Sequence, residues 1–336
     1  MSEPIVTIIV VTHNSARWLP RMLDAVAAQT ETRRRLVLVD NASRVEQRPS
    51  ALPAFATLNQ SEANLGFAAA NNLAARGATT PYLAFLNPDA FPEPAWLATL
   101  LTHAEHAPEV GAIGSTQIRA DDPSRFDGTG DVLHASGLAY RSGFGKPRTA
   151  PPLLGETFSA CAAAMLVRRE AFEAAGGFDE RYFCYFEDVD LGFRLRLLGW
   201  RVLQAPDAVV AHVGGGSTGR RSAFADFHGA RNRLWTFVKD MPPLLFWPLL
   251  PAHLIACAAA CTAALLTGRG FAAWRGLGAA IGELAPMWRS RQQVQATRKA
   301  STSDIARALA WDPFALLSRR AVICAQRRPA VSGSKT

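Results

Sequence analysis

The chain has 336 residues, 49% hydrophobic and 19% charged, a composition that excludes a disordered protein and allows one large α/β domain or two smaller ones. Its net charge of +8 arises beyond residue 240, where 12 Lys and Arg face 3 Asp and Glu, whereas residues 1–240 carry 24 against 25. We therefore expect only the C-terminal part to touch an anionic surface. Membrane lipid is favoured over nucleic acid, because no nucleic-acid recognition motif accompanies the charge.

The first 120 residues alternate short apolar runs with helical patterns. Strands are expected at Ile5–Val11, Leu36–Val39, Phe55–Leu58, Tyr82–Leu86 and Val110–Ile118, and helices after a cap at Asn14 or Ser15, over Gly66–Arg76 and over Pro94–His106. This alternation predicts an α/β fold with a Rossmann-like, mainly parallel sheet and helices on both faces. Ligands bind such sheets at the carboxyl ends of the strands. The residues that follow three of these strands should therefore line one crevice: Thr12-His13-Asn14, Asp40-Asn41 and Asn87-Pro88-Asp89.

Residues 121–238 are less regular. Loops are expected at Asp121–Gly130 and Ser142–Pro152, a strand near Val132–Tyr140, an extended run at Phe158–Val167 and a short helix at Arg169–Ala175. Short strands at Arg201–Gln204 and Ala208–Ala211 lead to His212 and the glycine-rich stretch Gly214–Gly219. We expect one domain over 1–238, made of two halves (1–120 and 121–238), and then a basic, apolar helical region over 239–336.

Three carboxylates, Glu187, Asp188 and Asp190, lie in the apolar and aromatic run from Tyr182 to Leu191. Burial of an ionised carboxylate costs several kcal/mol unless a partner, metal or substrate compensates it. Helical spacing follows as far as Gly199, so the acids should lie at a helix N-terminus, where the helix dipole favours negative charge. The alternative interpretation is an ordinary helix cap with acidic residues in the first turn.

The stretch Leu244–Thr267 lacks formal charge for 24 residues, long enough to raise the question of a transmembrane helix. Pro248 and Pro251 are expected to break its first third, and a basic region follows it. A single span would export that basic region from a cytoplasmic body, against the positive-inside tendency. An interfacial helix or shallow hairpin is favoured over a span and over a soluble helical appendage.

The five cysteines form no Cys-x-x-Cys pair, which favours reduced thiols in the cytosol over a disulfide framework. No signal peptide is expected, because Met1–Pro4 leads directly into an apolar run. We therefore expect a cytoplasmic protein that is peripherally associated with the inner face of the plasma membrane.

The order of the motifs resembles the family 2 glycosyltransferases of the GT-A fold, especially their bacterial rhamnosyltransferase-like branch. The matching blocks are Val10–Ser15, Val39–Ser43, Asn64–Phe67 with Asn71-Asn72, Leu86–Asp89, Gly176–Glu180, Tyr185–Leu191, and Gly199–Val202 with His212. Two departures stand out. Asn87 replaces the first acid of the family's Asp-x-Asp metal motif, and Ser159–Ala162 replaces an acceptor loop in which glycine is common.

This resemblance implies an inverting, metal-dependent transfer of a sugar from a nucleotide-sugar. It also implies that residues 1–120 form the nucleotide-sugar-binding half of the domain and residues 121–238 the acceptor and catalytic half. It assigns Asp188 as the general base, with Glu187 orienting the base or the acceptor. Asp89 and His212 are the implied ligands of a divalent metal, Mn²⁺ or Mg²⁺, which would stabilise the departing diphosphate. The alternatives are a strand-end turn for Asp89 and a hydrogen-bonded structural role for His212.

The nucleotide-sugar is expected to lie over the first strands. Asp40 can accept from N3–H of uracil or thymine, and the remaining residues of this set are Thr12, His13, Asn14, Asn41, Asn64, Gly66, Asn87 and Asp89. Asn64 and Gly66 would bring helix N–H groups to the ribose or diphosphate. Helix capping is the alternative for Asn14 and Asn64. Asp190 and Arg231 are expected near the acceptor or a phosphate; a cap and a solvated charge run are their alternatives.

The expected function is transfer of rhamnose from dTDP-rhamnose to a cell-envelope glycan or a polyprenyl-linked acceptor. Transfer of a hexose or galactofuranose from a UDP-sugar is the alternative within the same fold. A non-catalytic, membrane-associated scaffold is the other, and Asn87 is its best support. A dinucleotide-dependent dehydrogenase is set aside, because no G-x-G-x-x-G follows the first strand.

Overall fold

The computed structural model describes residues 3–49, 52–214, 222–266 and 268–322. Most of the glycine-rich stretch predicted at Gly214–Gly219, and the basic tail from residue 323, lie outside the described residues. Ten strands form the central sheet: β1 (Val6–Thr12), β2 (Arg34–Asn41), β3 (Ala56–Ser61), β4 (Tyr82–Leu86), β5 (Ala90–Pro92), β6 (Val110–Arg119), β7 (Phe126–Gly128), β10 (Gly155–Glu156), β11 (Ala164–Arg168) and β12 (Arg201–His212). A separate hairpin consists of β8 (Asp131–Leu133) and β9 (Ala139–Arg141).

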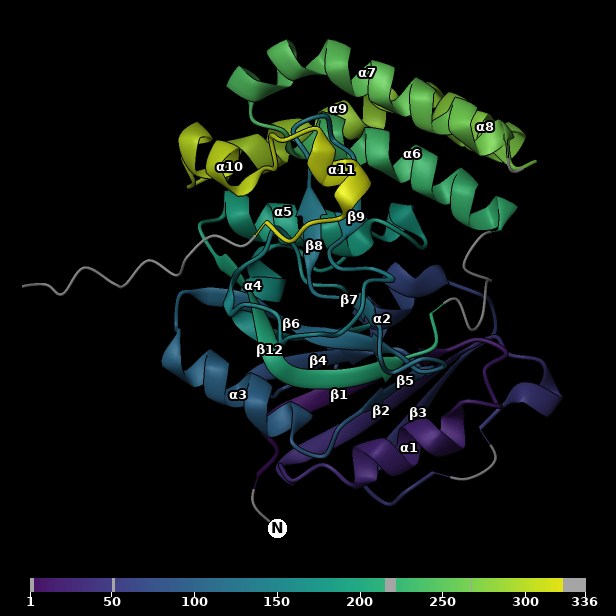
Figure 1. Ribbon diagram of the computed structural model, residues 1–336. Coiled ribbons are helices and arrows are strands. Elements are labelled where there is room, and N and C mark those ends of the chain that lie inside the picture. The colour runs from purple at the N-terminus through teal and green to yellow at the C-terminus, as the bar shows by residue number, and fades with distance from the viewer. Residues whose placement is uncertain (1–2, 50–51, 215–221, 267, 323–336) are drawn as a thin grey trace, which may run out of the picture.

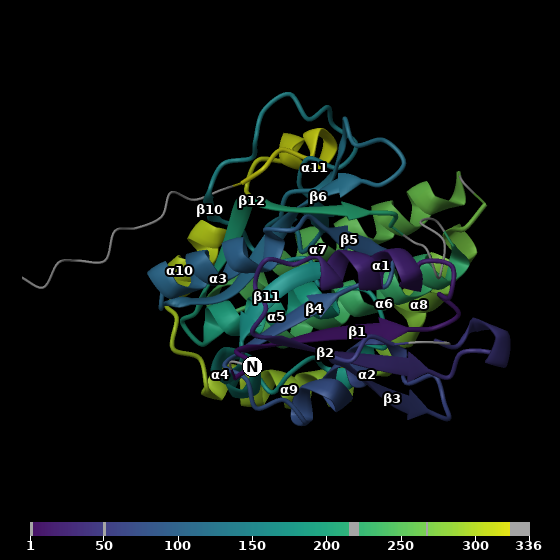
Figure 2. The ribbon, with the colours of Figure 1, turned by 90° about the horizontal axis from the view of Figure 1, so that it is seen from below.

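The sheet runs in the order β10-β12-β6-β11-β4-β1-β2-β3, as Figure 2 shows from below. The strands β4, β1, β2 and β3 are parallel, as the sequence predicts for the first half. The second half is mixed, because β11 is antiparallel to both β4 and β6, whereas β12 is parallel to β6. The carboxyl ends of β4, β1, β2, β6 and β12 consequently lie along one edge of the sheet.

Eleven described helices surround the sheet: α1 (Leu19–Ala27), α2 (Gly66–Arg76), α3 (Trp96–His106), α4 (Arg169–Ala174), α5 (Glu187–Leu197), α6 (Ala223–Asp240), α7 (Pro243–Leu265), α8 (Gly270–Gly282), α9 (Leu284–Ala296), α10 (Thr302–Ala308) and α11 (Phe314–Ser318). Alternate side chains of β1 are buried on opposite faces of the sheet. Ile8 and Val10 pack against α1 and α3, whereas Ile9 and Val11 pack with α2, α4 and α5. The helices α6 to α9 form a further layer beyond α5 (Figure 1).

Three expectations about the second half are corrected. The loop expected over 121–130 contains β7, and the strand expected near 132–140 is the β8–β9 hairpin. The two short strands expected after residue 200 are one strand, β12, which continues through an irregularity between Ala205 and Val209. A bulge interrupts the apolar pattern without ending the strand, so the sequence pattern showed two segments. In the first half, α1 starts after Trp18, and neither Asn14 nor Ser15 caps it.

The helix α7 is continuous through Pro248 and Pro251, so the predicted break is absent. Both prolines lie on the exposed side of the helix, where the carbonyl groups that lose their hydrogen bonds can meet solvent or a headgroup. Among the described helices, α7 is the one long and apolar enough to cross a membrane.

The C-terminal helices share a core with the second half of the sheet domain. Side chains of α5, α6, α7 and α9 are buried in one apolar cluster, which includes Phe193, Trp235, Phe246 and Met287. The chain beyond α10 also returns to β8, where Ala310 exchanges backbone hydrogen bonds with Leu133 and Ala135. The predicted boundary at residue 238 therefore falls inside α6, which packs on both sides of it.

Candidate active site

The carboxyl ends of β1 and β2 place Thr12 opposite Asp40 in the parallel register. Both side chains are buried, and Asp40 accepts a hydrogen bond from the Ser43 N–H (3.2 Å) and lies 3.6 Å from Arg48 Nε. Hydroxyl and carboxylate groups thus lie at the strand ends where a nucleotide base was predicted.

The loops after β1 and β2 are fastened to each other. His13 Nδ1 lies 2.8 Å from the Asn41 carbonyl oxygen, and the Asn14 N–H donates to Ser43 Oγ (2.9 Å). Asn14 and Ala42 both have positive φ angles (52° and 58°), a left-handed conformation that is uncommon for residues other than glycine. Such conformations often occur at ligand sites, so they support a binding role for these loops.

The start of α2 does not offer free N–H groups to an anion. The Gly66 N–H donates to Asn64 Oδ1 (3.0 Å), and the Phe67 and Ala68 N–H groups both donate to the Phe183 carbonyl. A Cβ atom on Gly66, whose φ is +79°, would lie 2.6 Å from that carbonyl oxygen. Gly66 therefore lets the loop before α5 cap α2, and the anion-donor role predicted for this helix start is corrected.

Asn41 joins the β2 end to the same helix. Its Oδ1 accepts from the Leu65 N–H (2.8 Å), and its Nδ2 donates to Asn64 Oδ1 (3.0 Å) and to the Gly66 carbonyl oxygen (3.2 Å). The hydrogen bonds of Asn41 and Asn64 thus shape the loop, which leaves their contact with a nucleotide-sugar a prediction.

Asn87, Asp89 and His212 come together because β5 pairs with the end of β12, with Ala90 opposite His212. His212 Nε2 lies 3.4 Å from both Asp89 Oδ1 and Asn87 Nδ2. His212 Nδ1 lies 2.8 Å from Asp127 Oδ2, and all three charged side chains are buried. Although burial disfavours the charged ring, the hydrogen bonds with Asp127 and Asp89 raise the pKa of His212.

This arrangement fits a divalent metal. When the Asp127 carboxylate accepts from Nδ1–H, the lone pair of the ring lies on Nε2, which faces Asp89. A carboxylate that orients a ligating histidine in this way is a common outer partner in metal sites. One carboxylate and one imidazole, with the Asn87 amide beside them, suit Mn²⁺ better than Mg²⁺.

Arg141 of β9 connects this group to α5. Its guanidinium donates to Asp127 Oδ2 (2.7 Å) and to Cys161 Sγ (3.1 Å). Cys161, Asp131 and Asp188 each offer an atom within 4.8 Å of the others. The predicted base and the predicted metal ligands therefore belong to one continuous set of side chains, Asp89–His212–Asp127–Arg141–Cys161–Asp188.

The group of Asp131, Cys161 and Asp188 suits a metal ion less well than Asp89 and His212. Burial raises the pKa of the Cys161 thiol to about 12, so the sulfur keeps its proton at neutral pH and is a poor ligand. The Arg141 guanidinium already supplies the positive charge next to it. Asp89 and His212 therefore fit a divalent metal better than this group does.

The two predicted catalytic acids at the start of α5 have different surroundings. Asp188 is half-buried, and its carboxylate accepts from the Val189 N–H (2.9 Å) and the Ala162 N–H (3.2 Å). Glu187 is buried, its Oε2 has no hydrogen-bond partner, and burial together with the Asp188 charge raises its pKa well above the usual value. Asp188 is thus the reachable acid of the two and the one whose carboxylate accepts two backbone hydrogen bonds.

The loop before α5 is strained. Phe183, Tyr185 and Phe186 all have positive φ angles, from 63° to 69°, a conformation that costs about 1–3 kcal/mol for each such residue. Asn232 of α6 compensates by donating to the Tyr182, Cys184 and Tyr185 carbonyl oxygens. A loop held in this way fixes the start of α5 and therefore the position of Asp188.

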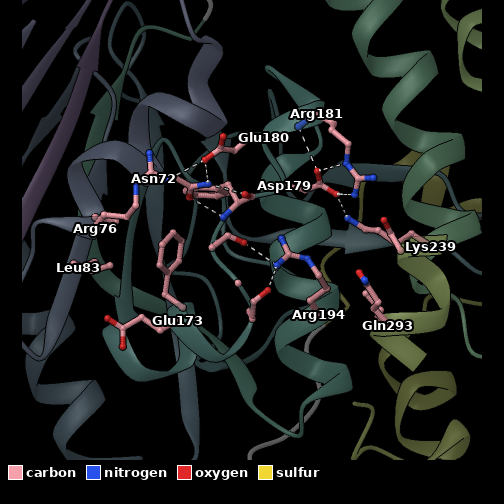
Figure 3. Close-up of a pocket in the computed structure, with 18 of the residues that line it drawn as sticks. Asn72, Arg76, Leu83, Glu173, Asp179, Glu180, Arg181, Arg194, Lys239 and Gln293 are labelled. Atoms are coloured by element: carbon pink, nitrogen blue, oxygen red, sulfur yellow. Dashed lines mark hydrogen bonds and ion pairs between the residues drawn. The ribbon is translucent and has the colours of Figure 1, made fainter. Parts of the chain in front are cut away.

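Asp190 is not available to an acceptor. It is fully buried and pairs with Arg194 (2.9 Å to Nε) and with Lys239, and Lys239 also pairs with Asp179 (2.8 Å). Figure 3 shows Arg194, Lys239 and Asp179 at a cavity of about 700 Å³, whose lining includes none of the predicted site residues. The spacing of two residues turns Asp190 to the opposite side of α5 from Asp188, so its predicted acceptor role is corrected to a structural one.

Arg231 is likewise engaged within the protein. Its guanidinium donates to the Arg181 and Tyr182 carbonyl oxygens (3.0 and 2.9 Å) and lies over the Trp235 ring at 4.3 Å. It supports the strained loop together with Asn232. The predicted phosphate contact is therefore replaced by a structural role.

The sequence analysis missed Asp127, Asp131 and Arg141. All three lie within residues 121–238, where the sequence pattern is less regular, and each is separated from its partner by at least 14 residues. The signal available in the sequence was the presence of acids next to glycine in Phe126–Asp131. Such a signal indicates a site without saying which partner the acid meets.

The chain is similar in sequence to a family model and to known proteins. Residues 7–176 match the family model described as glycosyl transferase family 2. Over 249 residues the chain is 32% identical to N-acetylglucosaminyl-diphospho-decaprenol L-rhamnosyltransferase of Mycobacterium tuberculosis (strain ATCC 25618 / H37Rv), covering 65% of this chain and 79% of that protein. Over 160 residues it is 35% identical to the O-antigen biosynthesis protein RfbC of Myxococcus xanthus, covering 44% of this chain and 12% of that one.

Two solved structures are similar in fold. GalNAc-T7 with UDP, GalNAc and Mn²⁺ gives a TM-score of 0.58 at 15% identity, covering 71% of this chain and 48% of that one. The mannosyltransferase PcManGT from Pyrobaculum calidifontis in complex with GDP-Man and Mn²⁺ gives 0.50 at 22% identity, covering 92% and 88%. The GT-A fold expected from the sequence is thereby confirmed.

Proposed function

Because the chain belongs to glycosyl transferase family 2, we propose that it transfers rhamnose from dTDP-rhamnose to a lipid-linked or cell-envelope glycan acceptor, with inversion and with the help of a divalent metal. The observation that carries the choice of sugar is the 32% identity with the mycobacterial rhamnosyltransferase, which extends over 79% of that protein. That relative acts on a decaprenol-linked acceptor by its name, which supports a polyprenyl-linked acceptor here.

Asp188 is the general base of the proposed reaction. The acceptor oxygen attacks the anomeric carbon while its proton passes to the Asp188 carboxylate, and the bond to the diphosphate breaks with its electron pair on the leaving group. One displacement of this kind inverts the anomeric configuration. The two backbone N–H groups hold the Asp188 carboxylate in place and support its role as the base, and Glu187 beside it is the acid that orients the acceptor or the base.

Asp89 and His212 would hold the metal, with Asn87 beside them. When bound, such an ion neutralises charge that develops on the diphosphate. Asp127 keeps His212 turned toward Asp89 through the 2.8 Å contact with Nδ1. Asn87 stands where the family motif has an acid, so one charged ligand is missing. His212, which Asp127 already orients, would compensate for it in part.

The nucleotide-binding part of the proposal rests on the hydrogen-bonded loops after β1 and β2. Thr12 and Asp40 lie at adjacent strand ends, and Asp40 supplies the acceptor for N3–H of a pyrimidine base. His13 and Asn14 would lie beside the base or ribose, since their backbone is fixed against Asn41 and Ser43.

The surface formed by α7 and α8 rests on the inner face of the plasma membrane in this proposal. The buried face of α7 is narrow, and large apolar side chains of both helices are exposed instead: Leu244, Trp247, Leu254, Ile255, Phe271, Trp274 and Ile281. Both helices lie at the outer end of the molecule, away from the sheet (Figure 1). An apolar helix surface with tryptophan and nearby arginine suits the headgroup region of an anionic bilayer.

A donor panel tests the reaction. Purified protein is assayed with dTDP-rhamnose, UDP-glucose, UDP-galactofuranose and GDP-mannose, with Mn²⁺, with Mg²⁺ and after chelation. We expect turnover with dTDP-rhamnose, loss of turnover on chelation, and a product whose anomeric configuration is opposite to that of the donor. Turnover with a UDP-sugar alone would replace the sugar, and retention of configuration would overturn the mechanism.

Vesicle flotation tests the membrane contact. Vesicles that contain phosphatidylglycerol should carry the protein upward, and the double variant Trp247→Ser, Ile255→Ser should remain below. Leu153→Ser is the matched control, because Leu153 is an exposed leucine outside α7 and α8. Equal flotation of the double variant and the control would overturn this contact.

A further inference from the structure

A second aspartate, Asp131 of β8, lies beside the proposed base. Its carboxylate, the Asp188 carboxylate and the Cys161 sulfur are all within 4.8 Å of one another. Asp131 is buried, whereas Asp188 is half-buried. Neither the sequence motifs nor the roles described above account for a second acid at this position.

The backbone of Asp131 is fixed by the segment that also holds Asp188. The Asp131 N–H donates to the Ser159 carbonyl oxygen (3.0 Å), and Thr157 Oγ1 donates to the Asp131 carbonyl oxygen (2.9 Å). Ser159 Oγ in turn donates to the Asp188 carbonyl oxygen (2.8 Å), and the Ala162 N–H donates to its carboxylate. One segment, 157–162, therefore sets the distance between the two acids.

The two carboxyl groups differ in their hydrogen-bond donors. Asp188 accepts from two backbone N–H groups, and in the described part of the chain no donor is directed at the Asp131 carboxylate. Arg141 bonds to Asp127 and Cys161 instead. When two carboxylates lie this close, one proton remains with the pair, and it goes to the group that has fewer donors.

The other ionisable neighbours agree with this division. Burial, with the Asp188 charge added to it, raises the pKa of Asp131 to about 8. Burial, together with the Asp188 charge, raises the pKa of Glu187 on α5 well above its usual value, and burial raises the pKa of the Cys161 thiol to about 12, so the thiol is neutral. Arg141 on β9 is the one cation facing the pair among the described residues, and it lowers the pKa of Asp131 only in part.

We propose that Asp131 is a positioning residue for the base: it holds the single proton of the Asp131–Asp188 pair, so that Asp188 alone is the carboxylate that can take the acceptor's proton. This inference rests on the proposed function. In the displacement, the acceptor proton passes to Asp188, the diphosphate leaves with the electron pair, and the proton on Asp131 stays in place. An ionised Asp131 would compete for the hydrogen bond of the acceptor hydroxyl and turn it away from the anomeric carbon.

The first test needs no substrate. Thermal unfolding of the wild type and of Asp131→Asn is compared from pH 4 to pH 9. The raised pKa of Asp131 gives stability that is present below about pH 4 and is lost as the pH rises to about 8. We expect the wild type to lose melting temperature relative to Asp131→Asn across this window and the difference to be constant above it.

The second test uses the pH profile of turnover. The wild type should lose activity as the pH passes about 8, and Asp131→Asn, which cannot ionise, should lack this alkaline limb. Cys161→Ser is the matched control in the same cluster and should keep the limb. A melting difference that does not vary with pH would overturn the inference, and so would an alkaline limb that Asp131→Asn retains.

These outcomes are separable from failure of the proposed function. If no donor is turned over by the wild type, the proposed reaction is wrong, while the unfolding comparison still decides where the proton of the pair lies. If turnover is present, the pH profile decides whether that proton serves Asp188.

Discussion

The helix α5 begins with acids that enter two different clusters, one on each side. Asp188 lies with Asp131, Cys161 and Arg141 toward the strand ends, whereas Asp190, two residues on, lies with Arg194 and Lys239 against α6. A helix advances 100° per residue, so two residues separate side chains by roughly 200°. The same short run of sequence thus supplies both a candidate reactive centre and a structural ion cluster.

The two clusters differ in how their charges are compensated. Each oxygen of Asp190 meets a cation, and Asp179 is compensated by Lys239 and Arg181, so these two acids need no ligand. The Asp188 side has two close carboxyl groups for the single guanidinium of Arg141, and Asp188 is reachable. Buried charges that are matched inside the protein fix the fold, whereas charges left short of partners are typical of a site that a substrate completes.

Asp188→Asn should give the largest effect. It keeps the shape and removes the base, so turnover should fall by about 10²–10⁴-fold while the affinity for dTDP stays close to that of the wild type. Initial rates and calorimetric titration measure the two quantities. Unchanged turnover in Asp188→Asn would show that Asp188 is not the base. The Asp188 side of α5 would then have no catalytic role that distinguishes it from the Asp190 side.

Asp190→Ala should act on stability instead. Removal of one partner from a buried ion cluster leaves Lys239 and Arg194 undercompensated and costs about 3–5 kcal/mol of unfolding free energy. Denaturant unfolding measures this loss. Glu173→Ala is the matched control, because it removes an exposed ion pair with Arg169 at the same helical spacing and should cost less than about 1 kcal/mol.

Equal effects of Asp190→Ala and Glu173→Ala would contradict the structural assignment of Asp190. So would a loss of turnover per folded molecule in Asp190→Ala, measured at low temperature where the variant is still folded.

Much of the fold could be predicted because the first half follows local rules. Short apolar runs and helical periods alternate there, and the residues after β1, β2 and β4 fall at one sheet edge, as parallel strands require. The second half could not be predicted equally well. The strands β7, β8 and β9 are each three residues long, too short for a periodic pattern, and the β8–β9 hairpin is held by distant partners such as Ser159 and Ala310.

The candidate site was predictable where motifs carried it and not where contacts decided it. Asp89, His212 and Asp188 were predicted from ordered motifs, and the structure connects these side chains through Asp127 and Arg141, which no motif contained. The role predicted for Asp190 was wrong because a motif does not show whether its acid faces a substrate or an arginine four residues further along the chain. Helical spacing to Arg194 was the available hint of its structural role.

Asp127→Asn sharpens the comparison on the reactive side. Asn keeps the size of Asp127 but weakens its hold on His212 Nδ1, so the affinity for Mn²⁺ should fall by about 10–100-fold. Titration of Mn²⁺ followed by electron paramagnetic resonance measures the free ion. An unchanged affinity in a variant with wild-type melting temperature would mean that His212 does not ligate the metal.

Asp240→Asn should have the smallest effect, on the structural side. Asp240 is fully buried beside Asp190 and forms no direct ion pair in the described part of the chain, and burial together with the Asp190 charge raises its pKa well above the usual value. Because burial favours the neutral acid over the carboxylate here, an amide of the same size should change the unfolding free energy by less than about 1 kcal/mol at pH 4. The raised pKa of Asp240 stabilises the wild type at low pH, and this contribution is lost as the pH rises. The unfolding free energy of Asp240→Asn should therefore increase relative to that of the wild type from pH 4 to pH 7. Denaturant unfolding at both pH values measures this difference in stability. A variant that becomes less stable than the wild type toward pH 7 would show that Asp240 is ionised and that the cluster around Asp190 contains one more negative charge than we infer.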